Sequence, residues 1–188
     1  MTFVYKEARL SNGLLLVGEI DPSTHTAAAG FFVRTGARDE PSAIMGVSHF
    51  LEHMMFKGSI HRSALDVNND FDQIGASHNA FTSGEMTAFH AHVLPEHLSS
   101  AIEILSDILR PALRKEDFEE ERGVILEEIA MYEDNPFMGL YEQMMEAYYK
   151  DHPLAHRVLG TKKTVSELPR TMQTWWIGRR TQGLTRDL

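Results

Sequence analysis

The pair Asn12-Gly13 stands between two β-prone runs, residues 4–10 and 14–20, and constrains the start of the fold more than any other feature. An Asn-Gly pair between such runs is a strong signal for a tight β-hairpin. The two runs are therefore predicted to pair as antiparallel strands. A third run, residues 26–34, ends at Thr35-Gly36 and is expected to form another strand.

Helical patterns follow this β-rich start. Pro41-Ser42 is expected to open a helix over residues 43–57, with Gly58 after its last residue. Ser63, with Asp66 three residues on, resembles a capping box and begins a helix that ends at Gly75. Further strands are predicted at 78–83 and 85–93, and further helices at 95–109, 115–133 and 137–149.

This order of elements predicts an α+β fold with a mainly antiparallel sheet and helices packed on one face. The length of 188 residues predicts one domain, here residues 1–167. Residues 168–188 have no sustained helical or strand period and are expected to form an irregular or divergent C-terminal tail.

Composition excludes several classes of function. The chain has no cysteine, so a metal site would have to use His, Asp or Glu. The formal net charge of −9 argues against a nucleic-acid partner, which needs clustered Lys and Arg. The first ten residues lack the apolar core of a secretory signal, and no run of about 18 apolar residues predicts a membrane span. A cytoplasmic location is the expectation.

The pattern His49-Phe50-Leu51-Glu52-His53 carries the chemistry of this chain. On a helix, residues four apart lie on one face, so two imidazoles at that spacing can meet one metal ion at about 2.0–2.1 Å each. Glu52 projects near the same face and is suited to take a proton from a metal-held water. Taken alone, the pattern also fits two partly buried helix histidines without a metal.

A zinc site needs a third protein ligand, and here it must be another His or a carboxylate. Glu121 and Glu128 lie seven residues apart on the predicted helix 115–133, so they share a face about 10.5 Å apart along the axis. One is suited to bind the metal, and the other to accept a hydrogen bond from a ligand histidine. A solvated helix face is the preferred interpretation of Glu119, Glu120 and Glu127.

In the order of these motifs the chain resembles the pitrilysin/insulinase-type metallopeptidases, and its processing-peptidase-like branch in particular. The resemblance rests on the segment 46–58 around the two histidines, on the segment 78–87, and on Glu128 within the segment 121–129. It extends over about residues 7–165. These enzymes are zinc-dependent hydrolases that carry an inverted zincin motif and catalyse proteolysis.

The resemblance implies a role for each matching residue. His49, His53 and Glu128 match the ligands of one Zn²⁺ per chain, Glu52 matches the general base, and Glu121 matches an acid that supports the metal site. Asn79 and Ala80 match an edge strand to which an extended peptide or unfolded polypeptide substrate adds. Without the family, Asn79 would be interpreted as a turn residue.

The resemblance also implies a partner. Enzymes of this family have two homologous halves that close over the substrate, and only the first half binds zinc. The chain matches this catalytic half, without its last strands, so we expect a second homologous half or subunit to complete the cavity. The alternatives are a non-catalytic structural or interaction subunit, an inactive truncated fragment, and a metal-dependent hydrolase of another substrate.

Two other pairs of histidines receive a weaker interpretation. His90 and His92 share one face of a predicted strand, and surface or interface positions are preferred over a metal site. His152 and His156 are four apart, but Pro153 between them works against a helix, so they are expected to be loop residues.

Overall fold

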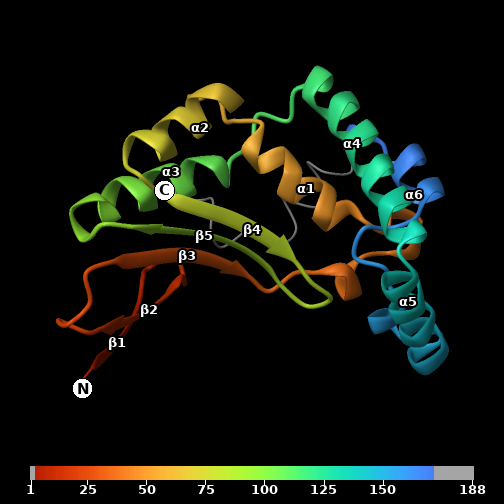
Figure 1. The fold of residues 1–188 in the computed structure, drawn as a ribbon, viewed down its shortest axis with the longest axis horizontal. Coiled ribbons are helices and arrows are strands. Elements are labelled where there is room, and N and C mark those ends of the chain that lie inside the picture. The colour runs from red at the N-terminus through yellow and green to blue at the C-terminus, as the bar shows by residue number, and fades with distance from the viewer. Residues whose placement is uncertain (1–2, 172–188) are drawn as a thin grey trace.

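The computed structural model describes residues 3–171 (Figure 1), in which three strands, a group of helices, two more strands and a second group of helices follow one another. The strands are β1 (Val4–Arg9), β2 (Leu15–Ile20), β3 (Ala27–Val33), β4 (Ser77–Thr82) and β5 (Thr87–Val93). The α-helices are α1 (Val47–Phe56), α2 (Ala64–Gln73), α3 (Leu98–Ile108), α4 (Lys115–Asp134), α5 (Pro136–Tyr149) and α6 (Lys162–Glu167). Short 3-10 helices are η1 (Ala37–Asp39), η2 (Ser42–Ile44), η3 (Pro95–His97) and η4 (Pro153–Ala155).

All strand pairings in the described residues are antiparallel, which confirms the predicted fold class. The strands form two sheets, however. The predicted hairpin pairs β1 with β2, with Val4 opposite Ile20, and stands as a sheet of its own. The other sheet has the order β3-β5-β4, so β5 is central and β4 lies at an edge.

Helices α1, α2 and α3 cover one face of the three-stranded sheet, as Figure 1 shows. The buried face of β5, with Phe89, Ala91 and Val93, packs with residues of α2 and α3 in one apolar cluster. A second cluster joins α1 to α4 and α6 around the stacked rings of Phe50 and Phe118. Helix α1 therefore lies where the two clusters meet.

The first helix after β3 starts later than predicted. The expected helix over residues 43–57 is interrupted: η2 ends at Ile44, and α1 begins only at Val47. Gly46 separates them with φ of +93°, in the left-handed region that interrupts a right-handed helix. At the other end, Gly58 follows the helix with φ of +98°, which agrees with its predicted place.

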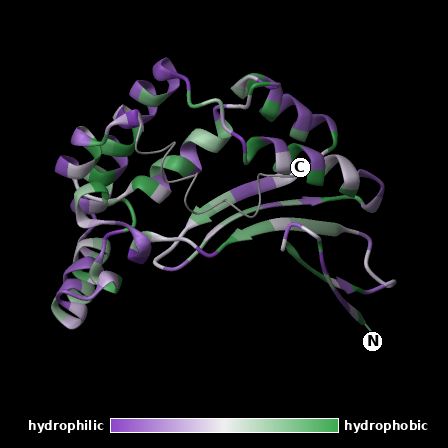
Figure 2. Ribbon diagram, turned by 180° about the vertical axis from the view of Figure 1, so that it is seen from behind, coloured by the Kyte–Doolittle hydropathy of each residue, from purple (hydrophilic) through white to green (hydrophobic). Residues whose placement is uncertain are grey.

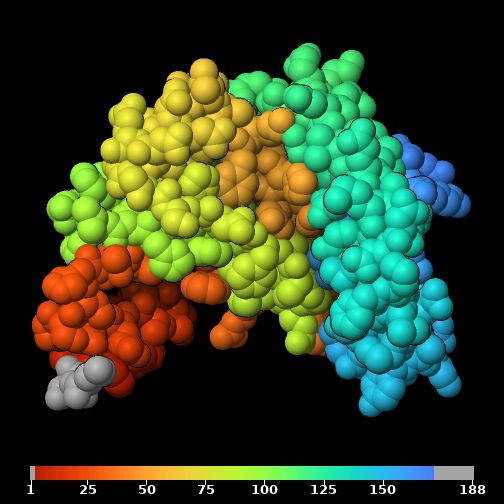
Figure 3. All heavy atoms as spheres, viewed as in Figure 1, coloured from red at the N-terminus to blue at the C-terminus, as the bar shows by residue number. Residues whose placement is uncertain are grey.

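The described part of the molecule is hollowed on the side away from α1–α3. The space-filling view shows this hollow between the β1–β2 hairpin, in red, and α5, in teal and blue (Figure 3). Apolar side chains are exposed on both flanks, among them Tyr5, Val17, Phe137 and Tyr148. Figure 2 shows green, apolar stretches along the hairpin strands and the sheet.

None of the helices within residues 3–171 combines the length and apolar character needed to cross a bilayer. The predicted tail lies mostly outside the described residues, because the description ends at Thr171.

Candidate metal centre

Helix α1 carries the two motif histidines at a buried position. His49 is 7% exposed and His53 is half-buried, and their ring centroids lie 4.7 Å apart. One helical turn separates them, so both rings project from the same face. The helix is held there by Phe50 and Met54, which are fully buried on the side toward α4.

Glu128 of α4 meets both imidazoles. Its Oε2 atom lies 3.6 Å from Nε2 of His49 and 3.7 Å from Nε2 of His53. Among the described residues, these three form the one group of His, Asp, Glu or Cys whose potential ligand atoms come together closely enough to hold a metal ion. Glu128 reaches the histidines because Ile125 and Ile129 bury the same side of α4 against α1.

Glu121, two turns earlier on α4, lies behind His53. Its Oε2 accepts a hydrogen bond from Nδ1 of His53 at 2.8 Å, and its Oε1 forms an ion pair with Nζ of Lys57 at 2.6 Å. The residue is 6% exposed. The His53 hydrogen bond holds the pKa of Glu121 below its usual value against the effect of burial, with Lys57 adding to it. Because the Glu121 carboxylate accepts from Nδ1, the proton of the neutral His53 imidazole is on that nitrogen. The lone pair of Nε2 then faces Glu128.

Glu52 sits beside the two histidines and is tied to the sheet. Its Oε2 accepts a hydrogen bond from the hydroxyl of Thr82, the last residue of β4, at 2.5 Å. Burial raises the pKa of Glu52, although the Thr82 hydrogen bond and the charge of His53 act against that rise. A carboxylate with a raised pKa is better suited to accept and return a proton near neutral pH.

Strand β4 carries Asn79 and Ala80 at the edge of the three-stranded sheet. In the described part of the chain β4 pairs only with β5. The N–H group of Ala80 donates to the side-chain Oδ1 of Asn79 at 2.9 Å. Asn79 is therefore a strand residue and not a turn residue. The same strand ends at Thr82, so its edge and the Glu52 carboxylate are structurally linked.

The geometry of the cluster fits a tetrahedral metal ion. Ligand atoms at about 2.0–2.1 Å from such an ion lie about 3.3 Å from one another, close to the two distances between Glu128 and the imidazoles. His49 keeps a buried Nδ1 without a hydrogen-bond partner among the described residues. Two imidazoles and one carboxylate are also the donor set that zinc accepts when cysteine is absent.

Electrostatics keep the first histidine neutral, as a metal ligand must be. Burial lowers the pKa of His49 to about 4, with the neighbouring His53 adding to the effect. For His53, burial acts downward, but the hydrogen bond to Glu121 and the nearby carboxylate charges outweigh it and leave the pKa raised. The two histidines of one motif thus differ because only one has a carboxylate on its second nitrogen.

The weaker pairs of histidines stay outside this group. His90 and His92 project from the same face of β5 with ring centroids 5.6 Å apart. His152 and His156 flank η4, where Pro153 occupies the first helical position. Nδ1 of His152 accepts from the N–H of Leu154, and Nδ1 of His156 lies 2.9 Å from the carbonyl oxygen of Ala37. His152 and His156 therefore each have a hydrogen-bond partner outside the candidate metal centre.

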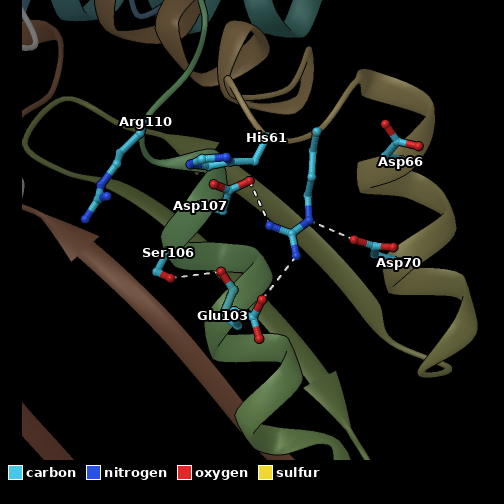
Figure 4. A pocket seen from close by; sticks show the side chains of 8 residues that line it. His61, Asp66, Asp70, Glu103, Ser106, Asp107 and Arg110 are labelled. Atoms are coloured by element: carbon cyan, nitrogen blue, oxygen red, sulfur yellow. Dashed lines mark hydrogen bonds and ion pairs between the residues drawn. The ribbon is translucent and has the colours of Figure 1, made fainter. Parts of the chain in front are cut away.

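A polar pocket of about 790 Å³ lies elsewhere, between the loop after α1 and helices α2 and α3 (Figure 4). Arg62 is its central cation and pairs with Asp70 at 2.7 Å, Asp107 at 2.9 Å and Glu103 at 3.3 Å. None of the predicted site residues lines this pocket. Four carboxylates and two arginines line the pocket, and the ion pairs of Arg62 tie α2 and α3 to the loop that follows α1.

Sequence reasoning assigned no role to two residues that touch the centre. Lys57 lies four residues after His53, at the C-cap of the same helix, a spacing from which its approach to Glu121 can be anticipated. Thr82 is 30 residues from Glu52, and its contact depends on how β4 packs against α1.

Comparisons with known proteins give a consistent result. The profile of the family described as insulinase (peptidase family M16) matches residues 15–162. A Mycobacterium tuberculosis protein, whose name describes an uncharacterized zinc protease, is 38% identical over 178 residues, which make up 94% of this chain and 41% of the relative. The chain thus spans about two fifths of that relative's length.

Solved structures show the same architecture. A structure described as an M16-like peptidase of Alicyclobacillus acidocaldarius matches with a TM-score of 0.88 and 28% identity, over 98% of this chain and 44% of that one. A protease from Helicobacter pylori matches with a TM-score of 0.91 over 97% of this chain and 45% of that one. At 22% identity, the latter likeness concerns the fold alone.

Proposed function

This chain belongs to the insulinase family of peptidases, family M16, and we propose on that premise that it is the zinc-binding catalytic part of an endopeptidase. The proposed substrate is an extended peptide or unfolded polypeptide. Relatives named as zinc proteases support the choice of metal and of reaction.

One observation carries the proposal: Nε2 atoms of His49 and His53 converge on Oε2 of Glu128, and Glu52 stands beside them. We assign His49, His53 and Glu128 as the ligands of one Zn²⁺ and Glu121 as the acceptor that orients His53. Zinc bound there would polarise the scissile carbonyl and lower the pKa of a water molecule.

Glu52 is the proposed general base and acid of the reaction. Its partly buried carboxylate takes the proton of the attacking water and returns it to the leaving amine. The Thr82 hydroxyl holds one carboxylate oxygen at 2.5 Å and leaves the other for this exchange. The raised pKa makes the carboxylate a stronger base than an exposed glutamate.

The edge of β4 is the proposed site of substrate binding. An extended chain that adds as a strand beside Asn79 and Ala80 forms main-chain hydrogen bonds with little dependence on its sequence. Because β4 leads to Thr82, a chain aligned on that edge is carried toward Glu52. The hollow below the sheet is open in the described residues, and we propose that a second homologous half or subunit closes it.

The variant Glu52→Gln tests the assignment. In a protein that contains this chain together with its second half, cleavage of a quenched fluorescent peptide is expected to fall about 10²- to 10⁴-fold. Zinc content, measured by elemental analysis after dialysis, is expected to stay near one per chain. Glu127→Gln is the matched control, because it removes the same charge from an exposed position of α4.

Undiminished cleavage by Glu52→Gln would contradict the role of that residue. Absence of zinc from the unaltered, folded protein would contradict the metal centre itself. Bound zinc without any cleavage, even with the second half present, would favour a non-catalytic interaction subunit.

A further inference from the structure

Glu40 is a buried carboxylate that the proposed reaction does not use. It follows η1 and is 3% exposed. Its Oε2 accepts from the N–H of Gly46 at 2.6 Å, and its Oε1 accepts from the N–H of Ser48 at 2.8 Å. Both donors belong to the start of α1, so one side chain binds the first turn of that helix with both of its oxygens.

The start of α1 needs such a partner because the helix has no cap of its own. The N-cap residue is Gly46, which has no side chain of its own to accept a hydrogen bond from the first turn. Side chains that usually cap helices are excluded at this position. A Cβ atom on Gly46 would lie 2.6 Å from the carbonyl oxygen of Leu159, and the φ of +93° disfavours any other residue. Free N–H groups at a helix start must find an acceptor elsewhere.

This turn also leads directly into the metal centre. Ser48, which donates to Glu40, immediately precedes His49, and a shift of the first turn moves that imidazole relative to Glu128. A negative charge at a helix N-terminus is favourable, so an ionised Glu40 holds the turn more firmly than a neutral one. We infer that Glu40 is a positioning residue that fixes the first turn of α1 and thereby places His49 for zinc. This inference rests on the proposed metal centre.

Burial of the Glu40 carboxylate lowers the stability of the fold when that group is ionised. Burial raises the pKa of Glu40 to about 7, although the N–H groups of Ser48 and Gly46 and the Ser48 side chain act against that rise. Asp39, on the same segment, raises it further. His156, after η4, is the titratable group that faces η1 from the other side, and it contacts the Ala37 carbonyl and Ser42. Because the folded-state pKa lies above the unfolded value, ionisation of Glu40 lowers stability as pH rises toward 7.

Stability and zinc affinity should therefore respond oppositely to Glu40→Gln. The amide keeps one acceptor but turns an NH₂ group toward the second N–H, so the first turn is held less well. At pH 8 zinc is expected to bind about 10-fold more weakly than to the unaltered chain. At pH 6, Glu40 of the unaltered chain is largely neutral, as the amide of the variant is at every pH, so the difference should shrink to within about twofold. The melting temperature of the metal-free variant should exceed that of the unaltered protein increasingly as pH rises from 5 to 8.

The experiment measures zinc dissociation constants by competition with a chelating dye, and melting temperatures in EDTA, between pH 5 and 8.5. Glu40→Asp is the second variant: it keeps the charge but withdraws the carboxylate by one methylene, so it should also weaken zinc binding at pH 8. Glu96→Gln, an exposed acid on η3, is the control for charge alone. An unaltered chain that binds no zinc would overturn the proposed function.

Two results would overturn only the role of Glu40. One is a Glu40→Gln variant that binds zinc as tightly as the unaltered chain at pH 8. The other is a loss of affinity that is the same at pH 6 and pH 8 and accompanies a lower melting temperature at both, which is the mark of ordinary packing damage. The expected result is the opposite trend of affinity and melting temperature with pH.

Discussion

Helix α1 and the β1–β2 hairpin are held in place by different forces. Seven of the ten residues of α1 are buried, including His49. The hairpin has no buried residue on either strand, and Tyr5 and Val17 are 62% and 59% exposed. Its order comes from its own ladder, and an isolated two-stranded hairpin is only marginally stable in water. The proposed metal ligands therefore lie where packing defines side-chain positions, whereas the strands of the hairpin are exposed in the described residues.

The largest effect is expected from a change in the packing between α1 and α4. Phe118→Ala removes a fully buried ring that stacks on Phe50 with centroids 4.6 Å apart. The free energy of unfolding should fall by about 3–5 kcal/mol, measured by urea titration of the metal-free protein. Zinc affinity should fall with it, because α1 and α4 meet at this contact. A loss below about 1 kcal/mol would mean that this cluster does not define the site.

The next largest effect is the loss of stability on acidification that results from the buried His49. The pKa of His49 is about 4 in the fold against a usual value of 6.5, so the unfolded chain binds the extra proton first as pH falls. Stability from His49 is present above pH 6.5 and is lost toward pH 4, by about 3 kcal/mol. Relative to His49→Asn, the metal-free protein should lose this amount between pH 7 and 4. Parallel unfolding curves for the two proteins would contradict the burial of a neutral imidazole.

Glu121→Gln is expected to have a smaller effect, which is measured as a loss of zinc affinity. It removes the carboxylate on Nδ1 of His53 and the partner of Lys57. Zinc affinity should fall about 10- to 100-fold, measured by chelator competition, since the imidazole is no longer oriented. Glu127→Gln on the exposed side of α4 provides the control. Equal affinities for both variants would argue that His53 is oriented by packing alone.

The smallest effect is expected in the hairpin. Val17→Ser replaces an exposed β2 residue, and the free energy of unfolding should change by less than about 0.5 kcal/mol. A melting temperature much lower than that of the unaltered chain would show that the hairpin is packed against something in solution. That result would place an additional contact on β2 beyond those of the described residues.

Local sequence signals predicted most helices and strands and the histidine motif. Contacts between residues far apart in the sequence were not predicted. Asn12-Gly13 predicted the hairpin, and the four-residue spacing predicted that His49 and His53 share a face. The start of α1 was predicted too early, because the left-handed Gly46 is imposed by the loop at Leu159, more than 100 residues away in the chain. The bonds from Thr82 to Glu52 and from Gly46 to Glu40 join residues with no periodic relation. The assignment of Glu128 and Glu121 to separate roles came from the family resemblance, and spacing alone left it open.

The hydrogen bond from Ala80 to its neighbour Asn79 has a consequence for the substrate binding proposed at the edge of β4. One main-chain donor on the free edge of β4 already has an acceptor, so an incoming strand must displace the Asn79 side chain. That exchange reduces the net gain from the new bond, which is itself only about 0.5–1.5 kcal/mol. If a peptide binds to this edge and is cleaved as proposed, the Asn79 side chain can bond to the same donor again as the product leaves. Under the proposed function, this hydrogen bond would favour the release of products and would weaken the addition of any other strand to the edge.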